Sequence, residues 1–494
     1  MQLTILKSGL SLILFILAMV AIAVLLPAAE APLPDPRQDY VLRNVHVVDV
    51  ERGLAGDPTS VTVKDGKIAA IGTETNVRGL PVIDGAGGYL IPGLWNMHMH
   101  SFQLSPQMHM PLLVANGITS VRDMMDCPGE SDTLIACAND KRRWNDEIVA
   151  GTLAGPRIAS VASYYFEGPD LTPADASRRA REAKARGIDE LKVYNRLSPA
   201  TYNQVAREAR ATGLRLVGHL PKAVSLEQAI AAGQRSFEHA HLFSRHCFAR
   251  ADDWRQGKLD AVPPHGLLEA MVAQFDEPAC TRAFALMRRS GAWYVPTHVT
   301  REDDARAFDP AFSGHARLAY LDPLSRWAFK DDLAGARSAF PGKRGERALK
   351  LYFDHGVRLT GAAHAAGVPI LVGTDTVTDG LRYHDELMHL ARAGLSPTDV
   401  LRAATINAAR FAGLESASGS IRVGKTADLV LLGANPLTDV RNLGNIRAVM
   451  IGGRTFDQPR LAELLRFTRA QAQRPANWIK LLWGFARSSV TSVL

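Results

Sequence analysis

Short apolar runs alternate with helix-patterned segments along the middle of the chain. Each run is short enough for one buried strand, and eight of them recur: Leu90–Met99, Ile118–Met124, Arg157–Ser163, Leu191–Asn195, Leu214–Leu220, Ser236–Ala240, Trp293–His298 and Pro369–Asp375. Three intervening segments have apolar residues at helical spacing and a glycine near the end: Pro173–Arg186, Pro199–Ala211 and Ser225–Ala232. This alternation predicts an α/β fold, a (β/α)8 TIM-like barrel with parallel strands over residues 91–415.

Both flanks of this barrel segment show a different pattern, in which apolar and polar residues alternate. Four segments carry it: Tyr40–Val48, Ser60–Ile71, Ala427–Leu432 and Ile446–Ile451. Turn residues at Asp65-Gly66 and Gly452-Gly453 predict hairpins. We therefore expect a small β-sandwich domain formed by residues 38–90 and 416–456. Three stretches are longer than a plain barrel unit needs and are predicted insertions with helices of their own: 125–156, 241–292 and 299–368.

Residues 1–31 form a separate N-terminal segment. Lys7 precedes an uncharged run, Ser8–Leu26, which is followed by the small residues of Pro27–Ala31. A positive start, an apolar centre and an A-x-A-like end are typical of a signal peptide, while the run is also just long enough to span a bilayer. A cleaved signal and a retained N-terminal anchor therefore both stay open. Either one predicts an exported protein, periplasmic or secreted, which is membrane-anchored if the segment is retained.

Composition and charge narrow the class of protein. Of the 494 residues, 47% are hydrophobic and 22% are charged, which excludes a mainly disordered chain and a fibre. The N-terminal run is the only long apolar one, so a polytopic membrane protein is excluded as well. The formal net charge of +7 is spread along the chain without a block of like charges, and we expect no nucleic-acid partner.

The four cysteines suit an oxidising compartment but are too few for a disulfide scaffold. They allow three connectivities, and sequence alone does not choose among them. We favour the local pairs Cys127–Cys137 and Cys247–Cys280, because each would close one long loop. The alternative is four unrelated buried thiols.

The tail, residues 457–494, is predicted to be helical. Four apolar side chains fall near one helical face: Trp478, Leu481, Leu482 and Phe485. This face either packs on the body or on a second subunit, or it lies in a membrane interface with Lys480 and Arg487 toward the lipid headgroups. Membrane association and a homo-oligomer are thus both left open.

Histidines and one carboxylate gather where the predicted strands end. His98 and His100 close the first run as H-x-H, and residues two apart in a strand point to the same side. Four more chemically capable groups lie in or at the end of later strands: Lys192, His219, His239 and Asp375. Active sites of such barrels are built at the C-terminal ends of the strands. We therefore expect all six groups at one mouth of the barrel.

These residue types suit a divalent metal site. Imidazole nitrogens and carboxylate oxygens bind such ions, and a catalytic site keeps one position open for water. The bound water ionises near pH 7 rather than near 15.7, and two ions about 3.5–4 Å apart are able to share it and to polarise a substrate carbonyl.

The motifs around these residues resemble those of the metal-dependent amidohydrolase superfamily, near its imidazolonepropionase-like and prolidase-like branch. The resemblance covers about residues 40 to 456 and rests on these motifs: DGKIAAIG, IPGLWNMHMHS, ELKVYN, GHLP, FEHAH, VGTDT and GKTADLVLL. As a set they are specific, whereas H-x-H alone would be weak.

This resemblance implies a binuclear centre with two divalent ions, most commonly zinc. His98, His100 and Asp375 match the ligands of the more buried ion, and His219 and His239 match those of the second. Lys192 matches the lysine that CO₂ carboxylates into a ligand bridging both ions. Asp375 also matches the general base that takes a proton from the bridging water and later gives it to the leaving amine.

Two further residues are candidates for substrate binding. Tyr194 follows Lys192 on the same strand face and would donate to a substrate oxygen, with simple packing as the alternative. His298 ends the seventh predicted strand and either contacts the substrate or is a buried structural histidine.

The expected function is a hydrolase that uses metal-activated hydroxide to cleave an amide C–N bond in a small molecule, either a dipeptide or an N-acyl amino acid. The same centre would also serve a lactone, a phosphotriester or a cyclic amide, because the loops set the substrate. A non-catalytic exported binding protein on the same scaffold is the alternative from another class.

Overall fold

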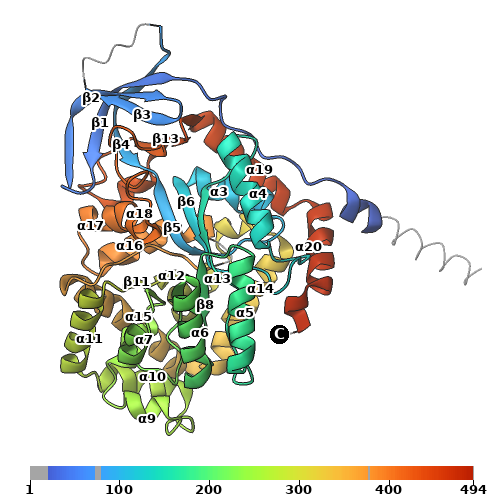
Figure 1. The fold of residues 1–494 in the computed structure, drawn as a ribbon, viewed down its shortest axis with the longest axis vertical. Helices are drawn as coiled ribbons and strands as arrows, with labels where there is room; N and C mark the ends of the chain where they lie inside the picture. Colours follow the sequence, from blue (N-terminus) through green and yellow to red (C-terminus); the bar gives the residue numbers. More distant parts are fainter. Residues whose placement is uncertain (1–19, 73–78, 377–378, 493–494) are drawn as a thin grey trace, which may run out of the picture.

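The computed structural model describes residues 20–72, 79–376 and 379–492, which form an α/β fold (Figure 1). Most of the predicted signal or anchor segment lies outside these residues. Within the described ranges, no helix combines the length and the apolar character needed to cross a membrane.

Both ends of the chain join in one seven-stranded sheet with the order β14-β13-β12-β4-β1-β2-β3. Its strands are β1 (Tyr40–Asp49), β2 (Leu54–Lys64), β3 (Lys67–Ile71), β4 (Val82–Pro92), β12 (Leu429–Leu432), β13 (Ile446–Ile451) and β14 (Arg454–Asp457). This confirms that the two ends build one β unit. The predicted sandwich is corrected, however, because β4 pairs with β1 along one edge and with β12 along the other and so joins both halves into a single sheet.

The two predicted hairpin turns of this sheet are present and lie against each other. Gly66 and Gly452 have φ of 71° and 57°, a left-handed conformation that favours glycine. A Cβ atom on Gly66 would lie 2.4 Å from the carbonyl oxygen of Gly452. The close approach of the two turns therefore requires glycine at position 66.

Seven of the eight predicted barrel runs contain parallel strands. They are β5 (Leu94–Met99), β6 (Ile118–Asp123), β7 (Arg157–Val161), β8 (Glu190–Val193), β9 (Arg215–Gly218), β10 (Ser236–Glu238) and β11 (Trp293–Val295). They pair as three parallel sheets, β5-β6-β7, β8-β9 and β10-β11. The first predicted run is split at Gly93, where a Cβ atom would lie 1.9 Å from Thr119 Oγ1, so that Leu90–Pro92 belong to β4 instead.

The eighth run, Pro369–Asp375, is not a regular strand, contrary to expectation. Pro369 has no N–H to donate, and the φ of 50° at Asp375 ends the extended conformation at the other end of the run. It still bonds to its neighbours: Tyr294 N donates to Pro369 O at 3.0 Å, and Met97 N donates to Val372 O at 2.7 Å.

The three predicted helices are confirmed within one residue at each end as α5 (Pro173–Ala185), α6 (Pro199–Thr212) and α7 (Leu226–Ala231). The predicted insertions also carry helices of their own. They are α4 (Ala138–Ala150), α8 (His241–His246), α9 (Ala251–Arg255), α10 (Pro264–Ala273), α11 (Glu277–Ser290), α12 (His298–Ala305), α13 (Pro310–Ser313), η1 (Ala316–Tyr320), α14 (Pro323–Ala339) and α15 (Gly342–Ala365). The others are α2 (Ser105–Met108), α3 (Met110–Ala115), α16 (Asp379–Arg392), α17 (Pro397–Ala403), α18 (Ile406–Ala412), α19 (Gln458–Ala472) and α20 (Pro475–Arg487), with the turns η2 (Val440–Gly444) and η3 (Ser489–Ser492).

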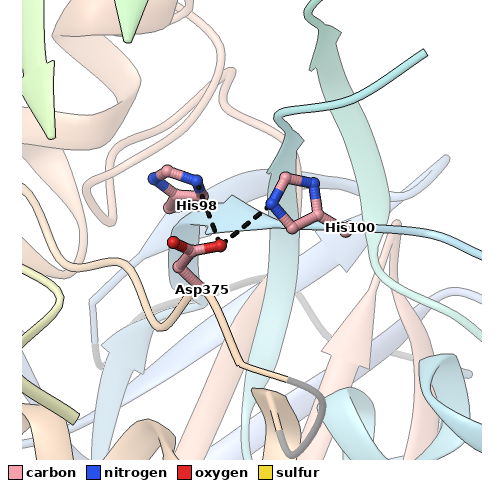
Figure 2. Close-up of side chains that lie close together, drawn as sticks. All are labelled: His98, His100 and Asp375. Atoms are coloured by element: carbon pink, nitrogen blue, oxygen red, sulfur yellow. Dashed lines mark hydrogen bonds and ion pairs between the residues drawn. The ribbon is translucent and has the colours of Figure 1, made fainter. Parts of the chain in front are cut away.

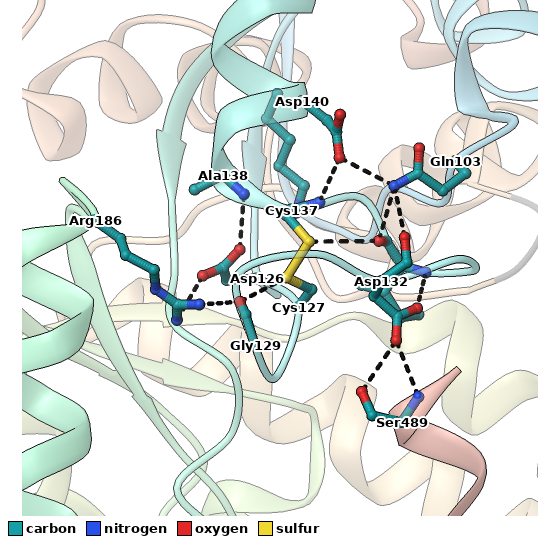
Figure 3. The surroundings of a disulfide bond; sticks show 12 residues. Gln103, Asp126, Cys127, Gly129, Asp132, Cys137, Ala138, Asp140, Arg186 and Ser489 are labelled. Carbon is teal, nitrogen blue, oxygen red and sulfur yellow. Dashed lines mark hydrogen bonds and ion pairs between the residues drawn. A yellow bond between two sulfur atoms is a disulfide. The ribbon is translucent and has the colours of Figure 1, made fainter. Parts of the chain in front are cut away.

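The predicted disulfide pairs, Cys127–Cys137 and Cys247–Cys280, are both formed. The first closes the loop between β6 and α4 (Figure 3). Asp132 in this loop accepts hydrogen bonds from the backbone N and the Oγ of Ser489, both at 3.1 Å, so that the loop is tied to the end of the chain.

The C-terminal tail is helical, as predicted, and one side of α20 packs on the body. Leu481 is buried beside Leu104 and Met108, and Thr133 Oγ1 donates to Gly484 O at 2.9 Å. Trp483 remains 42% exposed. The packing role is therefore present for one face of α20, while another face is open.

Candidate metal centre

Three of the predicted ligands converge at the end of β5 (Figure 2). His98 is fully buried in β5, His100 follows it, and Asp375 ends the eighth run. Asp375 Oδ1 lies 2.9 Å from His100 Nε2 and 3.4 Å from His98 Nε2. One ligand atom from each of the three residues lies within 4.8 Å of the other two. Segments some 275 residues apart in the sequence thus meet at one point.

The other two predicted histidine ligands face each other beside this group. His219 follows β9 and His239 follows β10, and their Nε2 atoms are 3.0 Å apart. On the far side of each ring, His219 Nδ1 donates to Asn195 Oδ1 at 2.8 Å, and His239 Nδ1 lies 2.9 Å from Thr297 Oγ1. Neutral His219 therefore carries its proton on Nδ1 and presents the Nε2 lone pair to the centre.

Lys192 lies beside both histidine groups. Its side chain extends from β8, and its Nζ atom is 3.3 Å from His98 Nε2. Burial is the main reason that its pKa falls to about 8, although Asp375 and Glu238 act in the opposite direction. All six predicted metal-site residues are therefore brought together by the fold.

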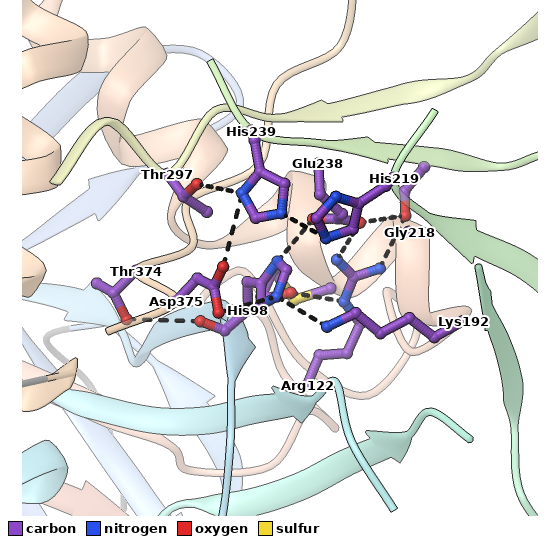
Figure 4. A network of polar contacts seen from close by, with 12 residues as sticks. His98, Arg122, Lys192, Gly218, His219, Glu238, His239, Thr297, Thr374 and Asp375 are labelled. Carbon is purple, nitrogen blue, oxygen red and sulfur yellow. Dashed lines mark hydrogen bonds and ion pairs between the residues drawn. The ribbon is translucent and has the colours of Figure 1, made fainter. Parts of the chain in front are cut away.

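The structure adds Glu238 to the functional residues, beyond those that the sequence analysis identified (Figure 4). His98 Nδ1 donates to Glu238 Oε2 at 3.0 Å, which leaves His98 Nε2 free to face the centre. Glu238 is itself held by Arg122 Nη2 at 2.9 Å and by Ser236 Oγ at 2.6 Å. A carboxylate that accepts from a ligand histidine fixes the ring and raises its basicity.

Glu238 was missed because neighbouring residues of a strand normally point to opposite faces, so His239 and Glu238 were not expected to serve one site. The backbone of His239 breaks this rule with a φ of 77°. Thr297 and Asp375 have φ of 46° and 50°, and both also lie at the centre. Each such non-glycine conformation costs about 1–3 kcal/mol and is typical of functional sites.

Burial favours the neutral form of three imidazoles, those of His100, His219 and His239. It lowers the pKa of His100 to about 4 and that of His239 to about 3, and it holds the pKa of His219 well below its ordinary value. Burial alone would raise the pKa of Asp375, but His98 and the hydrogen bond from His100 outweigh it and hold this pKa well below 3.8. The centre therefore offers at least three neutral imidazoles and an ionised carboxylate.

This donor set fits divalent metal ions. Neutral imidazole and carboxylate are common ligands of zinc and of similar ions. Two nitrogens bound at about 2.0–2.1 Å to one tetrahedral ion lie about 3.3 Å apart, close to the 3.0 Å between the Nε2 atoms of His219 and His239. The Glu238–His98 pair is the kind of outer contact that ligand histidines make.

A cavity of about 510 Å³ opens onto these residues. Tyr194 lines it, as expected for a substrate-binding residue, and its ring centroid lies 3.9 Å from that of His219. Burial raises the pKa of Tyr194 to about 12, so its hydroxyl keeps its proton at neutral pH. The predicted insertions supply other walls of the cavity, from α8, α12 and α14.

The structure does not place His298 at this cavity, contrary to the first of our two expectations. His298 is fully buried at the start of α12, and its Nε2 lies 3.0 Å from Thr360 Oγ1. Its ring lies 6.3 Å from that of Phe353. It does not line the cavity and fits the alternative of a buried structural histidine.

Comparisons with known proteins agree with this architecture. Residues 89–456 match the model of the amidohydrolase family. The chain is 26% identical over 441 residues to the imidazolonepropionase of Aromatoleum aromaticum, which covers 81% of this chain and 95% of that protein. Among solved structures, a bottromycin amidohydrolase superposes with a TM-score of 0.64 at 23% identity, covering 90% of this chain and 92% of that one. A Xaa-Pro dipeptidase superposes with a TM-score of 0.59 at 18% identity, covering 85% and 100%.

The chain therefore belongs to the amidohydrolase family. It is an enzyme of this family, a hydrolase that acts on carbon–nitrogen bonds of a small molecule.

Proposed function

We propose that this enzyme is a metal-dependent hydrolase that cleaves the amide bond of a dipeptide or an N-acyl amino acid. The convergence of His98, His100 and Asp375 within 4.8 Å carries the proposal. His219 and His239 complete a binuclear centre, in which zinc is the favoured ion. When bound there, such ions supply Lewis acidity and bring the pKa of water near 7.

The residues of the chain have distinct roles in this proposal. Asp375 accepts a proton from the attacking water at its carboxylate and then gives it to the leaving amine nitrogen. Tyr194 donates from its hydroxyl to the substrate oxygen. Glu238 acts through His98, whose ring it orients.

Lys192 is proposed to carry a carboxylate. Its neutral Nζ would form a bond to the carbon of CO₂ and lose a proton, which gives an anionic carboxylate whose oxygens would serve as ligands of the divalent ions. The position of Nζ, buried and 3.3 Å from His98 Nε2, supports this role. A cationic lysine would otherwise repel the ions beside it.

The test measures metal content and hydrolysis together. Purified enzyme is expected to hold two Zn, Mn or Fe ions per chain and to hydrolyse members of a panel of dipeptides and N-acyl amino acids. His98→Ala should lose bound metal and lower the rate by at least about 10³-fold. The control is His46→Ala, on β1, which removes a contact to Gly56 O and a ring stack on Tyr89, both away from the centre. Normal turnover by His98→Ala would refute the proposed centre, and absence of bound metal from active wild-type enzyme would refute metal dependence.

Hydrolysis of a cyclic amide is a second candidate, favoured by the likeness to an imidazolonepropionase over 95% of that protein. Adding ring amides to the same panel separates the two candidates. Cleavage of ring amides alone would replace the first proposal by the second.

We also propose that the eight runs close into one (β/α)8 barrel. Backbone hydrogen bonds of the eighth run support closure, because they join it to a strand on either side. Its carbonyl oxygens accept from Met97 N of β5 and from Tyr294 N of β11. Neighbouring sheets are also joined by single parallel bridges, Ala162 to Glu190 and Leu216 to Gln234. An experimental structure in which the eighth run leaves either neighbour would contradict closure.

The location of the enzyme is proposed to be outside the cytoplasm. The two disulfides support export, because such bonds persist in oxidising compartments. Lys480 of α20 donates to the carbonyl oxygen of Leu26, which is the last residue of the apolar run Ser8–Leu26. The end of this run therefore lies beside α20. Cell fractionation and N-terminal sequencing test export and distinguish a cleaved signal from an anchor. A cytoplasmic product with four free thiols would contradict export.

A further inference from the structure

The cavity beside the candidate centre contains one cation that the described part of the chain does not pair with a carboxylate. Two arginines line the cavity, Arg245 and Arg301. Arg301 Nη1 lies 2.7 Å from Asp304 Oδ2 and is thereby neutralised. Arg245 has the hydroxyl of Tyr352 as a polar neighbour but no carboxylate among the groups that influence its charge, and the neighbouring Arg301 repels it.

The other acidic groups of this wall are not available to Arg245. Asp303 forms an ion pair with Arg382 Nη1 at 2.7 Å. Asp375 accepts from His100. Asp332 is exposed to solvent. A guanidinium that lines a cavity without an anionic partner from the protein is well placed to bind an anion that enters from outside the chain.

Arg245 is held in a defined position facing the histidines. It follows His241 by one turn of α8, and the His241 ring lies 5.5 Å from that of His239. Its guanidinium carbon lies 5.4 Å from the centroid of the Trp254 ring, which packs against the guanidinium. The Cys247–Cys280 disulfide fixes the end of α8 two residues beyond Arg245.

We propose that Arg245 binds a carboxylate of the substrate, and that the enzyme therefore selects amides whose amine part carries an acidic group. This inference rests on the proposed amide hydrolysis and adds the group that recognises the substrate. A guanidinium presents paired N–H donors that match the two oxygens of a carboxylate. A neutral analogue of the substrate, such as its carboxamide, lacks the negative charge and one of the two oxygen acceptors that would face Arg245.

The test compares N-acetyl amino acids with the same compounds as C-terminal carboxamides, using metal-loaded enzyme. Wild-type enzyme should favour the carboxylates in kcat/KM. Arg245→Met should lower kcat/KM for the carboxylates by about 10- to 100-fold, mainly through KM, and change that for the carboxamides by less than about threefold. Arg245→Lys should fall between the two enzymes. The control is Arg250→Met, whose side chain is exposed and pairs with Asp253.

Three results would overturn the inference. The first is a wild-type enzyme that does not distinguish carboxylates from carboxamides. The second is an Arg245→Met enzyme that loses both activities equally while it keeps its metal and its thermal midpoint, because Arg245 would then be structural. The third is hydrolysis of neither set by metal-loaded wild-type enzyme, which refutes the proposed function itself and the inference with it.

Discussion

The candidate metal centre and a second buried cluster both gather histidines and carboxylates, but they balance charge differently. The second cluster, between α12 and α16, contains Glu302, His389 and Arg382. Arg382 pairs with three carboxylates: Glu302, Asp303 and Asp385. His389 Nε2 also lies 3.1 Å from Glu302 Oε2. Here the protein supplies its own counter-charges at hydrogen-bond distance.

In the centre, by contrast, several ring nitrogens face other nitrogens or lie beyond hydrogen-bond distance of a carboxylate. The Nε2 atoms of His219 and His239 point at each other, and that of His98 faces Lys192 and Asp375. Their Nδ1 atoms are already occupied, by Asn195, Thr297 and Glu238, of which Figure 4 shows the last two. A buried polar cluster whose members all pair with one another is structural. A cluster in which the Nδ1 contacts fix the histidine rings, but the Nε2 atoms face one another, is suited to bind an additional ligand.

The largest expected effect comes from removing the one lysine of the centre. Lys192→Ala deletes the proposed bridging ligand, so the rate should fall by about 10³-fold or more and bound metal should drop below two ions per chain. Formate or acetate should restore part of the rate by replacing the lost carboxylate. Metal analysis and kinetics check this, with Lys184→Ala on the exposed side of α5 as the control. Two bound ions and a full rate in Lys192→Ala would exclude the bridge.

A smaller effect is expected from Glu386, at the edge of the second cluster. Burial raises the pKa of Glu386 from 4.5 to about 7, although Val299 N donates to its Oε2 at 2.9 Å. Between these pH values the folded state binds a proton that the unfolded chain has released. The free energy of unfolding should therefore fall as the pH rises through this window, by up to about 3 kcal/mol, and the loss should be complete above pH 7.

Glu386→Gln keeps the shape of the side chain and does not ionise. The thermal midpoint of this variant, relative to that of the wild type, should therefore rise steadily between pH 5 and pH 7 and then level off. Glu415→Gln, an exposed change, should show no such trend. A constant difference between Glu386→Gln and the wild type across this range would show that Glu386 is ionised in the folded state.

Spacing and motifs identified the centre because its six residues are of rare types at strand ends, as with His98 and His100. The residues that orient the rings were not found, since Asn195 and Thr297 are ordinary polar residues and act through Nδ1 contacts that only the fold creates. The positive φ of His239, which brings Glu238 to the same site, also leaves no signal in the hydrophobic pattern.

The same limit explains the errors in the fold. The run Leu90–Met99 is apolar throughout because both of its parts are buried, and periodicity therefore does not mark the break at Gly93. A single sheet and a two-sheet sandwich give the same alternation of apolar and polar residues along the chain. Only the pairing of β4 with both β1 and β12 distinguishes them. Strand pairing is a long-range property, and it decides what local pattern leaves open.

The smallest expected effect separates the two kinds of buried histidine. His298→Phe keeps the ring volume and removes the contact from Nε2 to Thr360 Oγ1, which still donates to Gly356 O at 3.1 Å. The free energy of unfolding should fall by only about 1 kcal/mol, with kcat/KM and metal content unchanged. The matched change His239→Phe should instead abolish metal binding at the second position. If His298→Phe reduced the rate of folded, metal-loaded enzyme, His298 would belong to the substrate site after all, and its burial outside the cavity would not mark it as structural.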